Sequence, residues 1–282
     1  MKRIGIVSNA KKDVNFAVAN AAKAYLKDKA EVSDLSELAA RREYNNLALF
    51  EQFSHLDAIV VLGGDGTMLR AAVPAAKVDV PVLGINLGRV GFLAEAPLDK
   101  MEEALDRVLN DDYRIEERML LAAYNGEELL GYALNDFCIS RREMQRMINV
   151  KIIIDNENIE CYPCDGLIAS SPTGSTAYSL SAGGPVVSPD VESIILTPIC
   201  PHMINWRPIV LSSNEKITIA LAADEDKATI SADGEEVMNM NYSDSITISR
   251  APITVKFIKL YNTNFYEILF DKLHESNRRC KL

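Results

Sequence analysis

The stretch Asp57-Ala58-Ile59-Val60-Val61-Leu62-Gly63-Gly64-Asp65-Gly66-Thr67 decides the fold of the first part of this chain. Its unbroken apolar run predicts a strand that is buried on both faces. The glycines that close the run predict a sharp turn, and apolar residues then continue at helical spacing from Met68 to Ala76. A buried strand that leads through a turn into a helix is the building unit of a parallel α/β sheet.

The same alternation surrounds this stretch on both sides. Strands are predicted at Ile4–Val7, Val32–Leu35 and Val80–Ile85, and helices around Val14–Tyr25, at Leu38–Phe53 and at Met101–Leu109. Strands that alternate with helices imply βαβ units, so we expect residues 1–112 to form a doubly wound, Rossmann-like α/β domain.

After Tyr113 the pattern changes to short alternating runs, such as Lys216–Leu221 and Ser245–Arg250. Turn signals separate them at Asn125-Gly126, Asp155-Asn156, Asp224–Asp226, Asp233-Gly234 and Ser243-Asp244. Residues 113–262 are therefore predicted to form an all-β, sandwich-like domain, which makes the chain a two-domain α+β protein. A last helix is expected at Asn264–Leu273, and we expect the segment 263–282 to pack back on the first domain.

The composition excludes several classes of function. A net charge of −10 argues against nucleic-acid binding, because phosphate backbones are held by Lys and Arg. No apolar stretch approaches the roughly 20 residues of a membrane helix, and the start of the chain does not resemble a signal peptide. The pair Cys161 and Cys164 is the weak signal for zinc or redox chemistry, since structural zinc needs four ligands. We expect a cytoplasmic protein without a dedicated metal site.

The glycine turn has a chemical interpretation and a structural one. The backbone N–H groups and the positive dipole end of the following helix suit phosphate, and Asp65 is the one strongly functional side chain of the turn. In the structural interpretation, Asp65 is an ordinary N-cap. The turn matches neither the P-loop pattern nor Gly-x-Gly-x-x-Gly.

A second run, Asp165 to Pro185, combines hydroxyls, small residues and glycines with a single aromatic, Tyr178. Hydroxyls bind ribose or phosphate, small residues allow a ligand to approach closely, and Tyr178 is suited to stack on a base. The alternative is a Ser/Thr-rich surface loop, which the interleaved Ala177, Leu180 and Ala182 disfavour.

Together these motifs closely resemble those of bacterial NAD kinases. The resemblance covers nearly the whole chain in order and includes four motifs: Gly63–Thr67, Asn86–Gly88 with Gly91–Leu93, Asn135-Asp136, and Asp165–Pro185. It implies that the γ-phosphate of ATP passes to the 2′-hydroxyl of the adenosine ribose of NAD, with a divalent cation, Mg²⁺, carried by ATP. It also implies a homodimer or homotetramer, and it makes residues 113–262 the dinucleotide-binding domain.

The resemblance assigns the catalytic role of general base to Asp65. The remaining contacts to NAD or ATP fall on Gly63, Gly64, Gly66, Thr67, Asn135, Asp136, Arg146, Asp165, Thr173, Thr176, Ala177, Tyr178, Ser179, Leu180, Ser181 and Glu235. Two positions depart from the pattern of many relatives: Pro163, where a basic residue is common, and Glu235, where Gln is common.

Two other functions stay open at this point. A lipid kinase of the same superfamily shares the Gly-Gly-Asp-Gly turn, and a non-catalytic NADP(H)-binding sensor would share the scaffold. The intact Asp65 favours catalysis over the sensor, and the acidic net charge gives no support for a basic membrane-binding surface.

Overall fold

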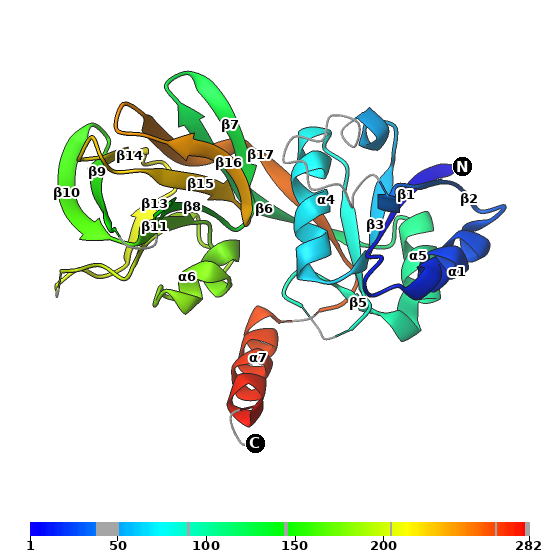
Figure 1. Cartoon of the computed structure of the whole chain (residues 1–282). Coiled ribbons are helices and arrows are strands. Elements are labelled where there is room, and N and C mark those ends of the chain that lie inside the picture. The colour runs from blue at the N-terminus through cyan, green and yellow to red at the C-terminus, as the bar shows by residue number, and fades with distance from the viewer. Residues whose placement is uncertain (38–50, 89–90, 144–145, 204, 263, 280–282) are drawn as a thin grey trace. The chain divides into compact units, whose positions relative to one another are not determined.

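The computed structural model describes residues 1–37, 51–88, 91–143, 146–203, 205–262 and 264–279. The chain forms two compact units (Figure 1): unit 1 comprises Met1–Glu117 with Val255–Leu282, and unit 2 comprises Arg118–Thr254. The expected domain borders lay at 112/113 and 262/263, a few residues from the borders of these units. Of the predicted helix Leu38–Phe53, residues 38–50 lie outside the described residues.

Unit 1 contains a parallel sheet in the order β2-β1-β3-β4. Its strands are β1 (Lys2–Ser8), β2 (Ala30–Asp34), β3 (Ala58–Gly63), β4 (Val82–Asn86) and the short β5 (Ala96–Pro97), and the end of β17 joins β4 through Phe257 and Val82. Its helices are α1 (Ala17–Leu26), α4 (Asp65–Lys77), α5 (Met101–Leu109) and α7 (Phe265–Arg279).

The helices cover both faces of this sheet because successive side chains of a strand point to opposite faces. Val60 and Leu62 share one core cluster with buried residues of α1 and α5, and α4 packs on the strands with its own buried face. All six residues of β3 are buried, as the apolar run predicts. The carboxyl ends of β1, β3 and β4 therefore form one edge of a rigid layer, where ligands of open α/β sheets bind.

Unit 2 contains two antiparallel layers. One has the strand order β13-β12-β11-β8-β15-β16, and in the other β10, β9, β14 and β17 follow one another, with β6 paired to β17 and β7. The strands are β6 (Arg114–Asn125, entering from unit 1), β7 (Glu128–Ala133), β8 (Asp136–Arg141), β9 (Ile148–Ile154), β10 (Glu157–Cys164), β11 (Gly166–Ser170), β12 (Ser193–Ile199), β13 (Ile209–Ser212), β14 (Ile217–Leu221), β15 (Ala228–Ala232), β16 (Glu235–Met240) and β17 (Ser245–Lys259).

The alternating burial of β9, β14 and β15 shows that these strands turn one face inward, and a single-turn helix, α6 (Tyr178–Ser181), follows β11. The turns at Asp155-Asn156 and Asp233-Gly234 have positive φ at both residues, as tight hairpins require. The prediction of an α/β part followed by a β-rich part is confirmed. No helix in the described part of the chain is long and apolar enough to span a membrane.

Candidate active site

The glycine turn of unit 1 is built around Thr67. Gly64 is the N-cap of α4, and its carbonyl accepts the N–H groups of Thr67 (2.8 Å) and Met68 (3.0 Å). A Cβ on Gly63 would lie 2.4 Å from Oγ1 of Thr67, so the side chain of Thr67 requires glycine at that position. Nδ2 of Asn9 donates to the same Oγ1 (3.0 Å). The Thr67 hydroxyl therefore ties the turn to the end of β1.

Asp65 is not the N-cap of this helix. It is the first helical residue, and its carboxylate reaches the loop that follows β4. The N–H of Phe92 donates to Oδ2 (3.0 Å) and the N–H of Leu93 donates to Oδ1 (3.1 Å). A Cβ on Gly91 would lie 1.9 Å from Oδ1, so only glycine permits this approach. The chain holds this carboxylate in one orientation.

Lys272 of α7 supplies a cation to the same carboxylate. Its Nζ lies 3.4 Å from Oδ2 of Asp65 and 4.2 Å from the ring centroid of Phe92. The ring of Phe92 also packs on Phe265 at a centroid distance of 5.9 Å. The side chains of Asp65 and Lys272 are 32% and 34% exposed, so a ligand can still reach the pair.

No neighbouring atom among the described residues requires glycine at position 66. A Cβ placed there meets nothing within 4 Å, and its φ lies outside the left-handed region. Because the N–H groups of a helix's first turn have no partner inside the helix, the open space beside Gly66 suits an anion that approaches the backbone. The turn therefore has the shape of a phosphate cradle.

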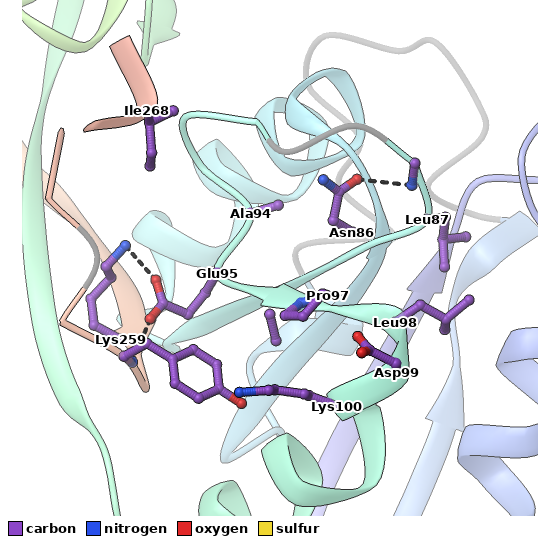
Figure 2. A pocket seen from close by; sticks show the side chains of 13 residues that line it. Asn86, Leu87, Ala94, Glu95, Pro97, Leu98, Asp99, Lys100, Lys259 and Ile268 are labelled. Atoms are coloured by element: carbon purple, nitrogen blue, oxygen red, sulfur yellow. Dashed lines mark hydrogen bonds and ion pairs between the residues drawn. The ribbon is translucent and has the colours of Figure 1, made fainter. Parts of the chain in front are cut away.

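A cavity of about 820 Å³ lies in unit 1 beyond this turn (Figure 2). Asn86, which pairs with Gly63 in the sheet, lines it; its Oδ1 accepts the N–H of Gly88 (3.0 Å), and its buried Nδ2 has no partner among the described residues. An ion pair between Glu95 and Lys259 lies in its wall. None of the site residues expected from the sequence lines this cavity.

In unit 2, the site residues expected at the start of β8 lie around the carboxylate of Asp233. Asp233 accepts the N–H groups of Leu134 (2.8 Å), Asn135 (2.7 Å) and Asp136 (3.2 Å). The N–H of Asp233 in turn donates to the carbonyl of Asp136 (3.0 Å). Glu235 begins β16 directly after this turn. The sequence predicted the turn but not the three bonds that fix Asn135 and Asp136.

The hydroxyl-rich run packs directly against this cluster. Ser171 donates from its backbone N–H to the carbonyl of Asn135 (2.8 Å), and a Cβ on Gly174 would lie 2.1 Å from that same oxygen. Oγ1 of Thr173 accepts a bond from Nη1 of Arg118 (3.3 Å). Asn135, Asp136 and Thr173 therefore belong to one packed cluster of unit 2.

In the next part of the hydroxyl-rich run, residues 176–181, some side chains are buried and others are exposed. Ser179 is fully buried and its hydroxyl bonds to that of Thr197 (2.8 Å), so it supports the turn. Thr176 bonds through Oγ1 to the carbonyl of Thr173 (3.3 Å). Tyr178 is 47% exposed. Of the other expected site residues beside it, Ala177 and Leu180 are partly buried and Ser181 is exposed.

Asp165 and Arg146 lie at the other end of the same strands. β8 pairs with β11 so that Asp136 is opposite Ser170 and Ser140 is opposite Gly166. Asp165 forms an ion pair with Arg141 (3.2 Å), and Arg146 forms one with Glu225 (2.7 Å). At about 3.3 Å per residue, Asp165 lies on the order of 15 Å from the cluster around Asn135. The structure thus does not bring these two residues into that cluster.

Burial changes the acid–base properties of unit 2. Burial, and then the charge of Asp233, raises the pKa of Asp136 to about 7. Burial raises the pKa of Asp233 to about 6, against the three backbone N–H bonds that lower it. Burial, followed by nearby groups that include Asp136 and Asp165, raises the pKa of Tyr178. Near neutral pH, Asp136 is divided between a carboxylic acid and a carboxylate.

Known proteins match both parts of the chain. The model of the ATP-NAD kinase N-terminal domain matches residues 4–113, and that of the C-terminal domain matches residues 134–260. The NAD kinase of Caldanaerobacter subterraneus subsp. tengcongensis is 38% identical over 282 residues, covering 98% of this chain and 100% of that protein. The NAD kinase of Heliobacterium modesticaldum is 42% identical over 231 residues, covering 80% and 82%.

Solved structures match as well. The NAD kinase from Archaeoglobus fulgidus in complex with ATP superposes with a TM-score of 0.75 at 28% identity, covering 96% of this chain and 98% of that one. Yeast NADH kinase complexed with NADH gives a TM-score of 0.84 at 24% identity, covering 98% and 88%. The second likeness concerns the fold alone.

An α/β unit that presents an aspartate on a glycine turn, together with these matches, defines a phosphotransferase with an alcohol group as acceptor. More specifically, the chain belongs to the ATP-NAD kinase family, since the two family models together match most of its length.

Proposed function

We propose that this chain transfers the γ-phosphate of ATP to the 2′-hydroxyl of the adenosine ribose of NAD, which gives NADP and ADP. The observation that carries the proposal is the carboxylate of Asp65, held by the N–H groups of Phe92 and Leu93 beside an open glycine turn. Relatives that are NAD kinases at 38% and 42% identity support the choice of substrates.

Asp65 acts as the general base in this proposal. Oδ2 accepts the N–H of Phe92 and the ammonium group of Lys272, whereas Oδ1 accepts only the N–H of Leu93 among the described donors and keeps a further lone pair, which can take the proton of the ribose 2′-hydroxyl. The ribose oxygen then bonds to the γ-phosphorus while the bond from that phosphorus to the bridging oxygen breaks, and ADP leaves with the electron pair. The transition state is loose, so orientation of the hydroxyl contributes as much as proton removal.

The divalent cation enters as part of the substrate. The described residues contain no group of three or more His, Cys, Asp or Glu side chains that could hold a metal ion. Magnesium commonly keeps several waters and binds through nucleotide phosphates rather than a protein cage. On this general behaviour of magnesium we propose MgATP as the donor, with Asp65 as the one carboxylate of the glycine turn.

Unit 2 supplies the dinucleotide contacts in this proposal. Asn135, Asp136 and Thr173 are held together there, and Asp136 in its two protonation forms can donate to or accept from a ribose hydroxyl. Tyr178 offers an exposed ring to a base. Asp165, Arg146 and Glu235 are proposed contacts to more distant parts of the ligand.

The test is an assay of the purified chain with ATP, Mg²⁺ and NAD, in which an NADP-specific dehydrogenase reads the product. Asp65→Asn keeps the size of the side chain and removes its charge, so we expect turnover to fall about 10²- to 10⁴-fold. NAD binding measured by calorimetry should persist in this variant. Near-full turnover of Asp65→Asn would refute the role of Asp65, and a folded wild type without NADP formation would refute the function.

Two further proposals concern the protein in the cell. We place it in the cytoplasm, where both of its substrates are present, and we propose that it assembles as a homodimer or homotetramer. Light scattering coupled to gel filtration measures the mass in solution, and a single mass near 31 kDa would contradict assembly.

A further inference from the structure

We propose that Lys12 binds the phosphates of the donor nucleotide, as the cation of the glycine turn. This inference rests on the proposed function and adds a residue that lies outside all the motifs of the sequence. Lys12 stands in the segment between β1 and α1, 53 residues before Asp65.

The position of the ammonium group is the first step of the argument. A Cβ built on Gly64 would lie 2.8 Å from Nζ of Lys12, and one built on Gly88 would lie 3.9 Å from it. Gly64 caps the helix that begins at Asp65, and Gly88 follows β4. The ammonium group thus lies close to the backbone that follows β3 and near the backbone that follows β4, which places its charge at the glycine turn.

The segment that carries Lys12 is fixed to the turn. The N–H of Lys12 donates to the carbonyl of Asn9 (2.8 Å), and Nδ2 of Asn9 donates to Oγ1 of Thr67 (3.0 Å). The backbone N–H of Asn9 donates to the carbonyl of Leu62 in β3 (3.0 Å). The backbone of Lys12 is therefore tied to the turn, and among the described residues its ammonium group lies near Gly64 without an ion-pair partner.

The surroundings present donors that an anion would satisfy. Lys12 is exposed and forms no ion pair within the part of the chain that the structure describes. The space beside Gly66 is open. Nδ2 of Asn86, on the next strand end, is buried without a partner among the described residues, and Asn86 is only 6% exposed. An ammonium group, a helix N-terminus and an unpaired amide at one strand edge fit a polyphosphate.

Lys12 and Lys272 have different surroundings. Lys272 lies beside the carboxylate of Asp65, so its charge is already balanced in the protein. Lys12 lies over uncharged backbone, so its charge is available to the ligand. We therefore assign the donor phosphates to Lys12, while Lys272 keeps Asp65 in place.

The experiment compares Lys12→Met with Lys11→Met, an adjacent exposed lysine whose side chain has no such position, and with Lys12→Arg. We expect Lys12→Met to raise the KM for ATP about 10- to 100-fold and the Kd for ATP to the same degree. The KM and Kd for NAD should change less than about twofold, since a charge on the donor's phosphates acts on one substrate. Lys12→Arg should recover part of the loss, and Lys11→Met should match the wild type.

The possible results separate the two proposals. If the wild type makes NADP and Lys12→Met leaves the KM for ATP unchanged, the role of Lys12 is wrong and the proposed function stands. If Lys12→Met weakens ATP and NAD equally, or lowers the melting temperature by several degrees, the residue supports the structure and the inference is also wrong. If the wild type makes no NADP, the proposed function fails, while calorimetry with ATP alone still tests Lys12.

Discussion

The acidic groups of the two units are held in different ways. Asp65 in unit 1 is one-third exposed, each oxygen accepts one N–H, and Lys272 balances its charge. Asp136 and Asp233 in unit 2 are raised in pKa by burial, and Asp233 accepts three N–H groups. An accessible, oriented carboxylate suits chemistry, whereas a buried acceptor suits architecture. Under the proposed function, unit 1 supplies the reacting group and unit 2 supplies the frame for the dinucleotide.

The largest effect is expected from a substitution that displaces the carboxylate of Asp65 while leaving Asp65 itself unchanged. Gly91→Ala would place a Cβ 1.9 Å from Oδ1, so the carboxylate must move. We expect kcat to fall about 10²- to 10⁴-fold, as for loss of a general base. Steady-state kinetics and a melting curve check the result. Gly66→Ala, where a Cβ meets nothing within 4 Å, should keep the free protein intact and act mainly on the KM for ATP.

The architectural role of Asp233 is tested by removing its acceptors. Asp233→Ala leaves the N–H groups of Leu134, Asn135 and Asp136 without this partner, and we expect a loss of about 3 kcal/mol in the free energy of unfolding. Asp233→Asn retains one acceptor oxygen and should lose less. Urea unfolding measures both variants. A loss below about 1 kcal/mol in Asp233→Ala would show that Asp233 does not hold this turn.

Lys272→Met tests whether α7 contributes to the reaction through Asp65. The variant loses the 3.4 Å contact but keeps an apolar chain against Phe92. Because the pair is partly exposed, we expect a modest fall in kcat of about 10-fold, with unchanged Kd values for both substrates. Glu267→Gln, on an exposed site of the same helix, is the control. An unchanged kcat would mean that Asp65 needs only its backbone donors.

The smallest expected effect concerns pH. Because the pKa of Asp136 is higher in the folded state, its contribution to stability is fully present below about pH 4 and is lost as the pH rises through about 7. Asp136→Asn mimics the neutral acid, so its stability relative to wild type should rise over that range. We expect the free energy of unfolding of Asp136→Asn to gain on that of the wild type between pH 4 and pH 8, measured by urea unfolding. Asp224→Asn, at an exposed position, should show no such trend.

The fold followed closely from the sequence because its elements are set by local patterns. Helix α5 has the predicted bounds, and β3 is the predicted buried strand shifted by one residue. Helix α4 extends three residues before the predicted start and continues past Pro74, since a helix can begin before its apolar stripe does. Strand β17 runs nine residues beyond the predicted Ser245–Arg250, through Pro252, because strand pairing across the sheet outweighs the local signal.

The site was only partly predictable from the sequence. Its contacts are made by backbone N–H groups and side chains of segments that are far apart along the chain. The sequence identifies Asp65, but it cannot show that the N–H groups of Phe92 and Leu93 bind it, or that Lys272 lies 207 residues away beside it. The motifs assign both Asp165 and Asn135 to the ligand site. Because β11 runs antiparallel to β8, however, Asp165 lies beside the end of β8 that is far from Asn135. Lys12 belongs to no motif, and only the strand order brings it to the turn.

The way the chain passes between the units has a consequence for biosynthesis. Unit 1 takes Phe257, Lys259 and Lys272 from its second segment, Val255–Leu282, although its first segment ends at Glu117. Since a chain is made from its N-terminus, unit 2 emerges from the ribosome while unit 1 still lacks the end of β17, which pairs with β4, and helix α7. The nascent protein can therefore fold unit 2 before the carboxylate of Asp65 acquires its partner Lys272.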